Sequence, residues 1–170
     1  MTINKMTSLK CLSTELITSE NFRPFGQVIF STADGKFYDD KDAQLSLNLG
    51  NPRFYIMRLH YQGIKFHQIT RHSQCTQCLG ALEGKDWFLA VAPPTEDKQP
   101  KIESIKAFHI PGNCFIKLAV GTWHAGPYFN HEIVDFYNLE LQDTNIVDHF
   151  SHNFRESHNL EFELLTMINR

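Results

Sequence analysis

The amino-acid sequence predicts an all-β protein built as a sandwich or barrel of short strands. Runs rich in β-branched and aromatic residues recur along the chain, and clusters of Gly, Pro, Asn and Asp separate them. Fourteen Phe residues and a hydrophobic fraction of 42% supply enough apolar surface for a substantial core. Regularly spaced strands of this kind are typical of β-sandwiches and β-barrels. Because 170 residues suit one ordinary domain, we expect a single domain over residues 1–170.

Nine segments have the composition of β-strands. They are residues 27–30, 44–49, 53–60, 66–71, 77–82, 87–93, 105–109, 114–118 and 134–141. Turn signals such as residues 50–52 and 111–113 separate them. We expect a closing strand near the end of the chain, where Leu160, Phe162 and Leu164 alternate with polar residues.

Two of these segments carry apolar residues on both faces. Residues 87–91 are apolar almost throughout, and both alternating sets of side chains in residues 53–60 are largely apolar. Such strands are expected inside a stacked assembly. The tripeptide 83–85, Glu-Gly-Lys, predicts a tight hairpin that joins residues 77–82 to the strand from Trp87.

Helix is expected only at the periphery. Thr18, Ser19 and Glu20 are suited to cap a short helix that ends before Pro24, because proline disfavours helical conformation in the residue before it. Residues 93–100 are polar and bounded by prolines, which predicts a surface loop.

The charge balance argues against several classes of partner. Sixteen Lys and Arg against 19 Asp and Glu leave a net charge of −3, so we expect neither nucleic acid nor an anionic membrane as a partner. No apolar run approaches the ~18 residues of a spanning helix, and residues 1–12 lack the apolar stretch of a signal peptide. The sequence therefore predicts a cytoplasmic protein. Its four cysteines are too few for a disulfide framework and are expected to be reduced.

Two distant segments carry side chains that are able to line one site. Thr70, His72 and Gln77 belong to the first segment, and His124 follows Gly121 in the second. A barrel that binds a metal or a small acid needs ligands from separate strands on one interior face, because each strand offers only every second side chain there.

The chemistry of these residues suits a small-molecule site. Thr70 and His72 share one face of a strand, and a kink near residues 73–75 would return Gln77 to that face. Imidazole is both a metal ligand and a proton acceptor near neutral pH, whereas the amide of Gln77 coordinates weakly or holds a ligand by hydrogen bonds.

Two other groups are interpreted as structural. Cys75 and Cys78 have the spacing of zinc and redox motifs, but they lack a second pair and would point to opposite faces of a strand. We interpret both as small apolar residues. His149, His152 and His158 lie in an otherwise polar tail, which favours a solvated surface over a metal site.

Residues 70–93 and 108–141 resemble the ureidoglycolate lyase family, once called ureidoglycolate hydrolase, within the cupin superfamily of small β-barrels. The resemblance is carried by Arg71-His72, Gln77, residues 87–92, Gly121-Thr122-Trp123-His124 and Asp135-Phe136, and more weakly by residues 25–29 and 48–50. It implies a cupin-like β-sandwich or jelly-roll barrel with a short peripheral helix. It also implies a homodimer.

The cupin motifs resemble His-x-His followed by Glu, and later Gly-x-x-His. Here these positions read Thr70, His72, Gln77 and His124, so that Gln replaces the carboxylate. Thr70 stands where the lyase family usually has Glu. After His124 the family usually continues with His and Pro, where this chain has residues Ala125-Gly126. The resemblance implies a divalent ion, Ni²⁺ or Mn²⁺, held by His72, Gln77 and His124.

The resemblance implies an enzyme of allantoin and purine catabolism that cleaves the C–N bond of ureidoglycolate, a small carboxylate, into glyoxylate and urea. His124 or His72 would act as the base. Lys117 is a cationic candidate for catalysis, because its side chain alternates away from those of Ile116 and Leu118. Strand alternation points Arg71 away from His72, which weakens its case as the group that binds the carboxylate.

The side chains expected to contact the substrate are Arg71, Gln77, Trp123 and Thr70. The alternative is a divergent cupin that binds another small carboxylate or a sugar acid and has no lyase activity. Thr70 and Ala125, which depart from the family pattern, favour this alternative.

Overall fold

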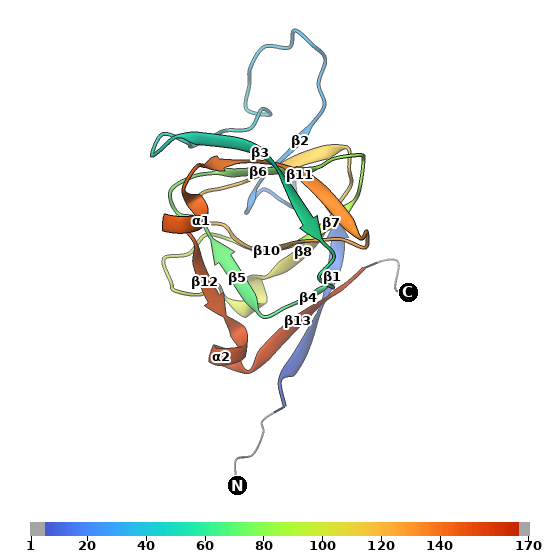
Figure 1. Ribbon diagram of the computed structural model, residues 1–170, viewed down its shortest axis with the longest axis vertical. Helices are drawn as coiled ribbons and strands as arrows, with labels where there is room; N and C mark the ends of the chain where they lie inside the picture. Colours follow the sequence, from blue (N-terminus) through green and yellow to red (C-terminus); the bar gives the residue numbers. More distant parts are fainter. Residues whose placement is uncertain (1–5, 167–170) are drawn as a thin grey trace.

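A computed structural model describes residues 6–166, and β-strands are the main secondary structure of this part of the chain (Figure 1). The strands are β1 (Ser8–Leu16), β2 (Gly26–Phe30), β3 (Pro52–His60), β4 (Lys65–Phe66), β5 (Gln68–Arg71), β6 (Gln77–Ala81), β7 (Trp87–Ala92), β8 (Lys106–Ile110), β9 (Cys114–Leu118), β10 (Trp123–Tyr128), β11 (Ile133–Leu141), β12 (Phe150–Asn153) and β13 (Leu160–Leu165). The helical elements are short: η1 (Ile102–Ser104), α1 (Thr144–Val147) and α2 (Phe154–His158). The predicted all-β class is confirmed.

The strands form two sheets. The eight-stranded sheet has the order β12-β5-β10-β7-β8-β1-β13-β4, and the five-stranded sheet has the order β2-β9-β6-β11-β3. Only His67 separates β4 from β5, although these strands lie near opposite ends of the larger sheet. The larger sheet must therefore curl until its ends approach each other, and it forms a half-barrel under the smaller sheet (Figure 1).

Strand β7 shows how the sequence builds two cores. Trp87, Leu89 and Val91 belong to the core between the two sheets, whereas Phe88 and Ala90 belong to a second core inside the curled sheet. Every residue of this strand is buried, as its almost continuous apolar sequence predicts.

The predicted hairpin at residues 83–85 is wrong. Strand β6 pairs with β9 and β11, whereas β7 pairs with β8 and β10, so the turn carries the chain from one sheet to the other. Glu83 has a φ of 60° and Gly84 a φ of 67°, which are angles that tight hairpin turns also use. The same turn residues therefore suit both a hairpin, in which the next strand pairs with the previous one, and a turn that carries the chain to the facing sheet.

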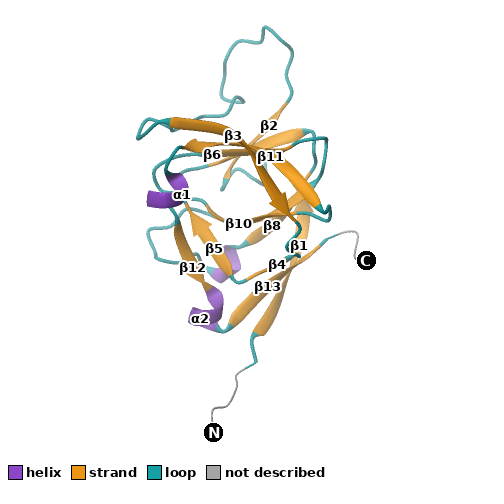
Figure 2. Ribbon diagram, viewed as in Figure 1, coloured by secondary structure: helices purple, strands orange, loops and turns teal. Residues whose placement is uncertain are grey.

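Three further expectations need correction. Residues 18–25 form turns instead of the predicted peripheral helix, and the helices that do occur are α1 and α2 near the end of the chain (Figure 2). Residues 44–49 form no strand and belong to the long loop between β2 and β3. Strand β3 is an edge strand whose outer face is exposed, with Phe54 67% and Ile56 55% accessible.

The helices of the described segment, residues 6–166, are all too short to cross a lipid bilayer. The cytoplasmic location stays a prediction from the sequence.

Candidate active site between the two sheets

The two histidine-bearing segments meet at one end of the space between the sheets. The amide of Gly121 donates to the carbonyl of His72 at 2.7 Å, which fastens the turn before β10 to the end of β5. Gly121 has a φ of 81°, a conformation that favours glycine at this turn. The rings of His72 and His124 lie 5.0 Å apart between centroids. The predicted proximity of these two residues is therefore present in the structure.

Backbone carbonyls fix the orientation of both rings. Nδ1 of His72 donates to the carbonyl of Asp148 at 2.5 Å, and Nδ1 of His124 donates to the carbonyl of Thr122 at 3.3 Å. A neutral imidazole that carries its proton on Nδ1 has an unprotonated Nε2. Both histidines therefore present Nε2 as an acceptor.

Gln77 adds a third acceptor. Its Nε2 donates to Oδ1 of Asn138 at 3.1 Å and to Oε2 of Glu140 at 3.0 Å, while its Oε1 is buried without a partner in the described residues. Because both amide hydrogens are engaged, Oε1 is the atom left for a ligand. The buried carboxylate of Glu140 thus determines which end of the Gln77 amide faces the pocket.

The pocket between these side chains is small and electrically neutral. The gap is bordered by His72, Gln77 and His124 together with four neighbours, Cys75, Leu118, Ala119 and Thr122, and it is too small to admit a water molecule. The ring of His124 is enclosed although the residue as a whole is half-buried, and burial, helped by the nearby His72, lowers the pKa of His124 to about 3. His124 is accordingly neutral at physiological pH.

Thr70 lies beside this pocket in the predicted place. It pairs directly with His124 across β5 and β10, so their side chains share a face. Its hydroxyl is engaged with that of Ser151 at 2.6 Å. One hydrogen bond does not use the full capacity of a hydroxyl, so Thr70 keeps a free position for a ligand.

Arg71 and Trp123 are not brought to the pocket. The guanidinium of Arg71 stacks over the ring of Trp123 at 4.5 Å and over that of Phe150 at 5.1 Å, and its Nη1 donates to the carbonyl of Thr95 at 2.6 Å. Trp123 is fully buried in the second core, on the face of β10 opposite to His124. Both side chains join structural elements, and neither is placed to contact a ligand held by His72 and His124.

Lys117 is also placed away from the pocket. Ile116 and Leu118 point into the core between the sheets, so Lys117 lies on the outer face of the smaller sheet, beside Cys78 across the β6–β9 pair. Burial lowers the pKa of Lys117 and raises the pKa of Cys78 to about 11. Lys117 does alternate with Ile116 and Leu118 as expected, but its side chain lies on the outer face of the sheet, whereas the pocket lies on the inner face.

The sequence interpretation missed four residues that build the site. His149 was assigned to the solvated tail, but its ring lies 5.8 Å from that of His72 while the residue remains exposed. Asp148 accepts the amides of Ser73 and Gln74 with its carboxylate, at 2.7 and 2.8 Å. The other two residues are Asn138 and Glu140.

A signal for Asn138 and Glu140 is present in the sequence. In β11 the buried positions are every second residue, and Asn138 and Glu140 are in phase with the core residues Val134 and Phe136. Polar side chains at core positions of an alternating strand indicate a buried polar network. No comparable pattern marks His149 or Asp148.

The side-chain atoms available as ligands indicate which of the two predicted metals the site suits better. Within residues 6–166 no cluster of three or more His, Cys, Asp or Glu side chains is arranged to hold an ion. Nε2 of His72, Nε2 of His124 and Oε1 of Gln77 are three neutral donors, a set that suits Ni²⁺ better than Mn²⁺, which prefers carboxylates.

The fold and the site together define a class of protein: a small β-sandwich with a histidine-lined pocket between its sheets, similar to the cupins. The family model of ureidoglycolate lyase matches residues 9–161, and the chain belongs to this family. Among individually curated proteins, none matches the chain significantly.

Proposed function

We propose that the protein is a ureidoglycolate lyase, which converts ureidoglycolate to glyoxylate and urea. The observation that supports this best is the pocket of three acceptors formed by His72, His124 and Gln77. A ureido group offers several N–H donors and needs such acceptors, whereas a carboxylate would be repelled by them. Membership of the family supports the same reaction.

The two imidazoles suit the proton transfers of this cleavage. As the hydroxyl proton leaves the substrate, its O–H electrons form the carbonyl of glyoxylate and the C–N electrons pass to the ureido nitrogen. His124 or His72 takes the hydroxyl proton on Nε2, and the same proton then protonates the leaving nitrogen. The pKa of about 3 makes His124 a weak base, and its protonated form returns the proton readily to the leaving nitrogen.

The substrate carboxylate needs a separate partner. None of the residues that line the pocket carries a fixed positive charge. We propose that a divalent ion held by His72, His124 and Gln77 would supply this charge when bound, because metal ions polarise and orient carboxylates. The ion would then replace the imidazole base, since an Nε2 atom that holds a metal cannot accept a proton. The exposed ring of His149 lies 5.8 Å from that of His72, on the solvent side of the site.

A product assay tests the proposal and separates it from the alternative. Purified protein, with and without added Ni²⁺, is incubated with ureidoglycolate, and glyoxylate, urea and ammonia are measured. A lyase releases glyoxylate and urea in equal amounts and no ammonia, whereas an amidohydrolase releases ammonia. If folded protein releases neither product, a divergent cupin that binds another small acid becomes the better interpretation.

We further propose that the protein is a homodimer that pairs through the outer face of the five-stranded sheet. Phe54 and Ile56 of β3 are largely exposed, and Phe54 stacks on Tyr137, which in turn contacts Phe115. Exposed apolar side chains that adjoin one another are typical of subunit interfaces. Sedimentation analysis of wild type and Phe54→Asp tests this: the wild type should sediment as a dimer and the variant as a monomer.

A further inference from the structure

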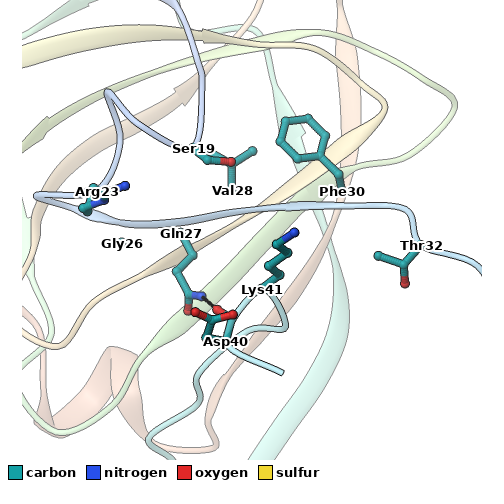
Figure 3. A pocket seen from close by; sticks show the side chains of 9 residues that line it. All are labelled: Ser19, Arg23, Gly26, Gln27, Val28, Phe30, Thr32, Asp40 and Lys41. Atoms are coloured by element: carbon teal, nitrogen blue, oxygen red, sulfur yellow. Dashed lines mark hydrogen bonds between the residues drawn. The ribbon is translucent and has the colours of Figure 1, made fainter. Parts of the chain in front are cut away.

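A large groove lies along the free edge of β2, away from the histidine pocket. Strand β2 is the edge of the five-stranded sheet, and the groove has a volume of about 450 Å³ and opens to solvent (Figure 3). Its walls come from the turns before β2, the strand itself and the long loop after it. The lining residues are Ser19, Arg23, Gly26, Gln27, Val28, Phe30, Thr32, Asp40 and Lys41. None of them lines the histidine pocket.

The loop that forms one wall is held in place by its own polar contacts. Gln27 donates from Nε2 to the carbonyls of Asp40 and Asp42 at 3.0 and 3.2 Å, and it accepts the amide of Gln44 at 2.9 Å. Lys36 pairs with Asp39 and with Asp42, at 3.0 and 2.9 Å. The wall therefore does not depend on a ligand for its position.

Two cationic side chains of the groove, Arg23 and Lys41, take no part in this network. Within residues 6–166, neither the guanidinium of Arg23 nor the ammonium of Lys41 forms a salt bridge or a hydrogen bond with another side chain or carbonyl, although both line the groove (Figure 3). Ser19 and Thr32 add hydroxyl groups to the same walls. Unpaired cations next to hydroxyl donors are suited to bind an oxyanion.

The groove also has an apolar side. Val28 and Phe30 of β2 line it, and Phe30 is 47% exposed, so its ring offers contact area to a ligand. Asp40 lies on the loop side and leaves an excess of one positive charge among the lining residues. This balance favours a ligand with one negative charge over a polyanion.

We propose that this groove is a second binding site, which takes an organic acid with one carboxylate and an apolar chain. Lys41 holds the carboxylate, Arg23 at the other end of the groove adds to its positive potential, and the chain lies against the exposed ring of Phe30 (Figure 3). The volume is in the range of small-ligand sites. None of these residues belongs to the site proposed for ureidoglycolate, so this site does not depend on the lyase proposal.

Hexanoate is the probe that fits this description, with 1-hexanol as the probe that lacks the charge and inorganic phosphate as the one that lacks the chain. Ligand-observed NMR with full-length protein measures saturable binding of each. We expect hexanoate to bind and 1-hexanol and phosphate to bind at least about tenfold more weakly, since each lacks one of the two contacts.

The double variant Arg23→Gln/Lys41→Gln tests the residues, and Lys98→Gln, an exposed lysine in the loop at residues 93–100, is the matched control. We expect the double variant to weaken hexanoate binding by about tenfold or more and Lys98→Gln to leave it unchanged. His124→Ala should bind hexanoate as the wild type does, because it alters only the histidine pocket. Absence of saturable hexanoate binding to the wild type, undiminished binding by the double variant, or equal binding of phosphate would each overturn the proposal.

Discussion

Nδ1 of His72 lies 2.5 Å from the carbonyl oxygen of Asp148, a residue 76 positions further along the chain. Because a carbonyl only accepts, the neutral ring must carry its proton on Nδ1 and leave Nε2 open. The carboxylate of Asp148 also holds the amides of Ser73 and Gln74. The orientation of a histidine at the centre of the candidate site therefore depends on the segment before β12, which carries no motif.

The contact between Gln77 and Glu140 predicts the effect of restoring the cupin carboxylate. In Gln77→Glu an oxygen replaces the amide nitrogen that lies 3.0 Å from Oε2 of Glu140. Two buried carboxylates at that distance repel each other, and one of them must take a proton. We expect a loss of about 2–4 kcal/mol of stability at pH 8, measured by urea denaturation.

The pH dependence of stability and a second substitution test whether repulsion between the two carboxylates causes the loss. Repulsion raises a carboxyl pKa in the folded state, so the lost stability should return as the pH falls below that value. Gln77→Glu/Glu140→Gln restores one donor and one acceptor and should recover most of the stability at pH 8. Equal stability of Gln77→Glu at pH 5 and pH 8 would contradict the explanation.

His124 predicts part of the acid sensitivity of the fold. Burial lowers its folded-state pKa to about 3, below the ~6.5 of an unfolded chain, so protonation favours the unfolded state. Its contribution is complete above about pH 6.5 and is lost as the pH falls towards 3, with a slope of at most about 1.4 kcal/mol per pH unit.

Denaturation of wild type and His124→Gln between pH 6.5 and 4.5 measures this contribution as the difference between their slopes, because the two proteins share all other titrating groups. The variant should show the shallower slope, and His60→Gln, a substitution of an exposed histidine on β3, should match the wild type. Identical slopes for wild type and His124→Gln would show that the ring is not held neutral by burial.

Arg71 is expected to act on stability instead of on catalysis. Arg71→Lys loses the stacking on Trp123 and Phe150 and the forked geometry that reaches the carbonyl of Thr95. We expect a cost of about 1–3 kcal/mol in unfolding free energy, with kcat/KM per folded molecule within about twofold of wild type. A large fall in kcat/KM at unchanged stability would instead show that Arg71 acts in substrate binding or catalysis.

Thr70→Glu tests whether the pocket can hold a metal. Thr70 faces the same side as His124 on the neighbouring strand, so a carboxylate there adds an anionic donor to the three neutral ones. We expect Ni²⁺ binding, measured by calorimetry, to tighten by about tenfold or more. Thr70→Gln is the neutral control, since it also loses the hydrogen bond to Ser151; equal affinities of the two variants would count against the site.

The positions of several strands could be predicted from local sequence, but the pairing of the strands into sheets could not. The apolar run of β7 and the alternation of β11 mark strands whatever their neighbours. The Glu-Gly-Lys turn does not reveal whether β6 and β7 share a sheet, because that depends on contacts with β9, β10 and β11. Residues 18–25 have caps for a helix, yet Phe22 and Phe25 are buried against Phe108, and packing overrides the local preference.

The sequence predicted those site residues that lie on the inner face of their strands by simple alternation. Thr70, His72 and His124 share the expected face because alternation is a backbone property. The positions of Lys117 and His149 depend on which face of a sheet is inner and on how the end of the chain returns to β5. Those are properties of the whole fold, and no short stretch of sequence contains them.

The most direct test of the account is turnover of ureidoglycolate by wild type, His124→Ala and the surface control Lys98→Ala, each loaded with Ni²⁺ and shown to be folded. The account predicts glyoxylate and urea in equal amounts from wild type and Lys98→Ala, and a loss of at least about a hundredfold in kcat/KM for His124→Ala. Full turnover by His124→Ala would contradict it.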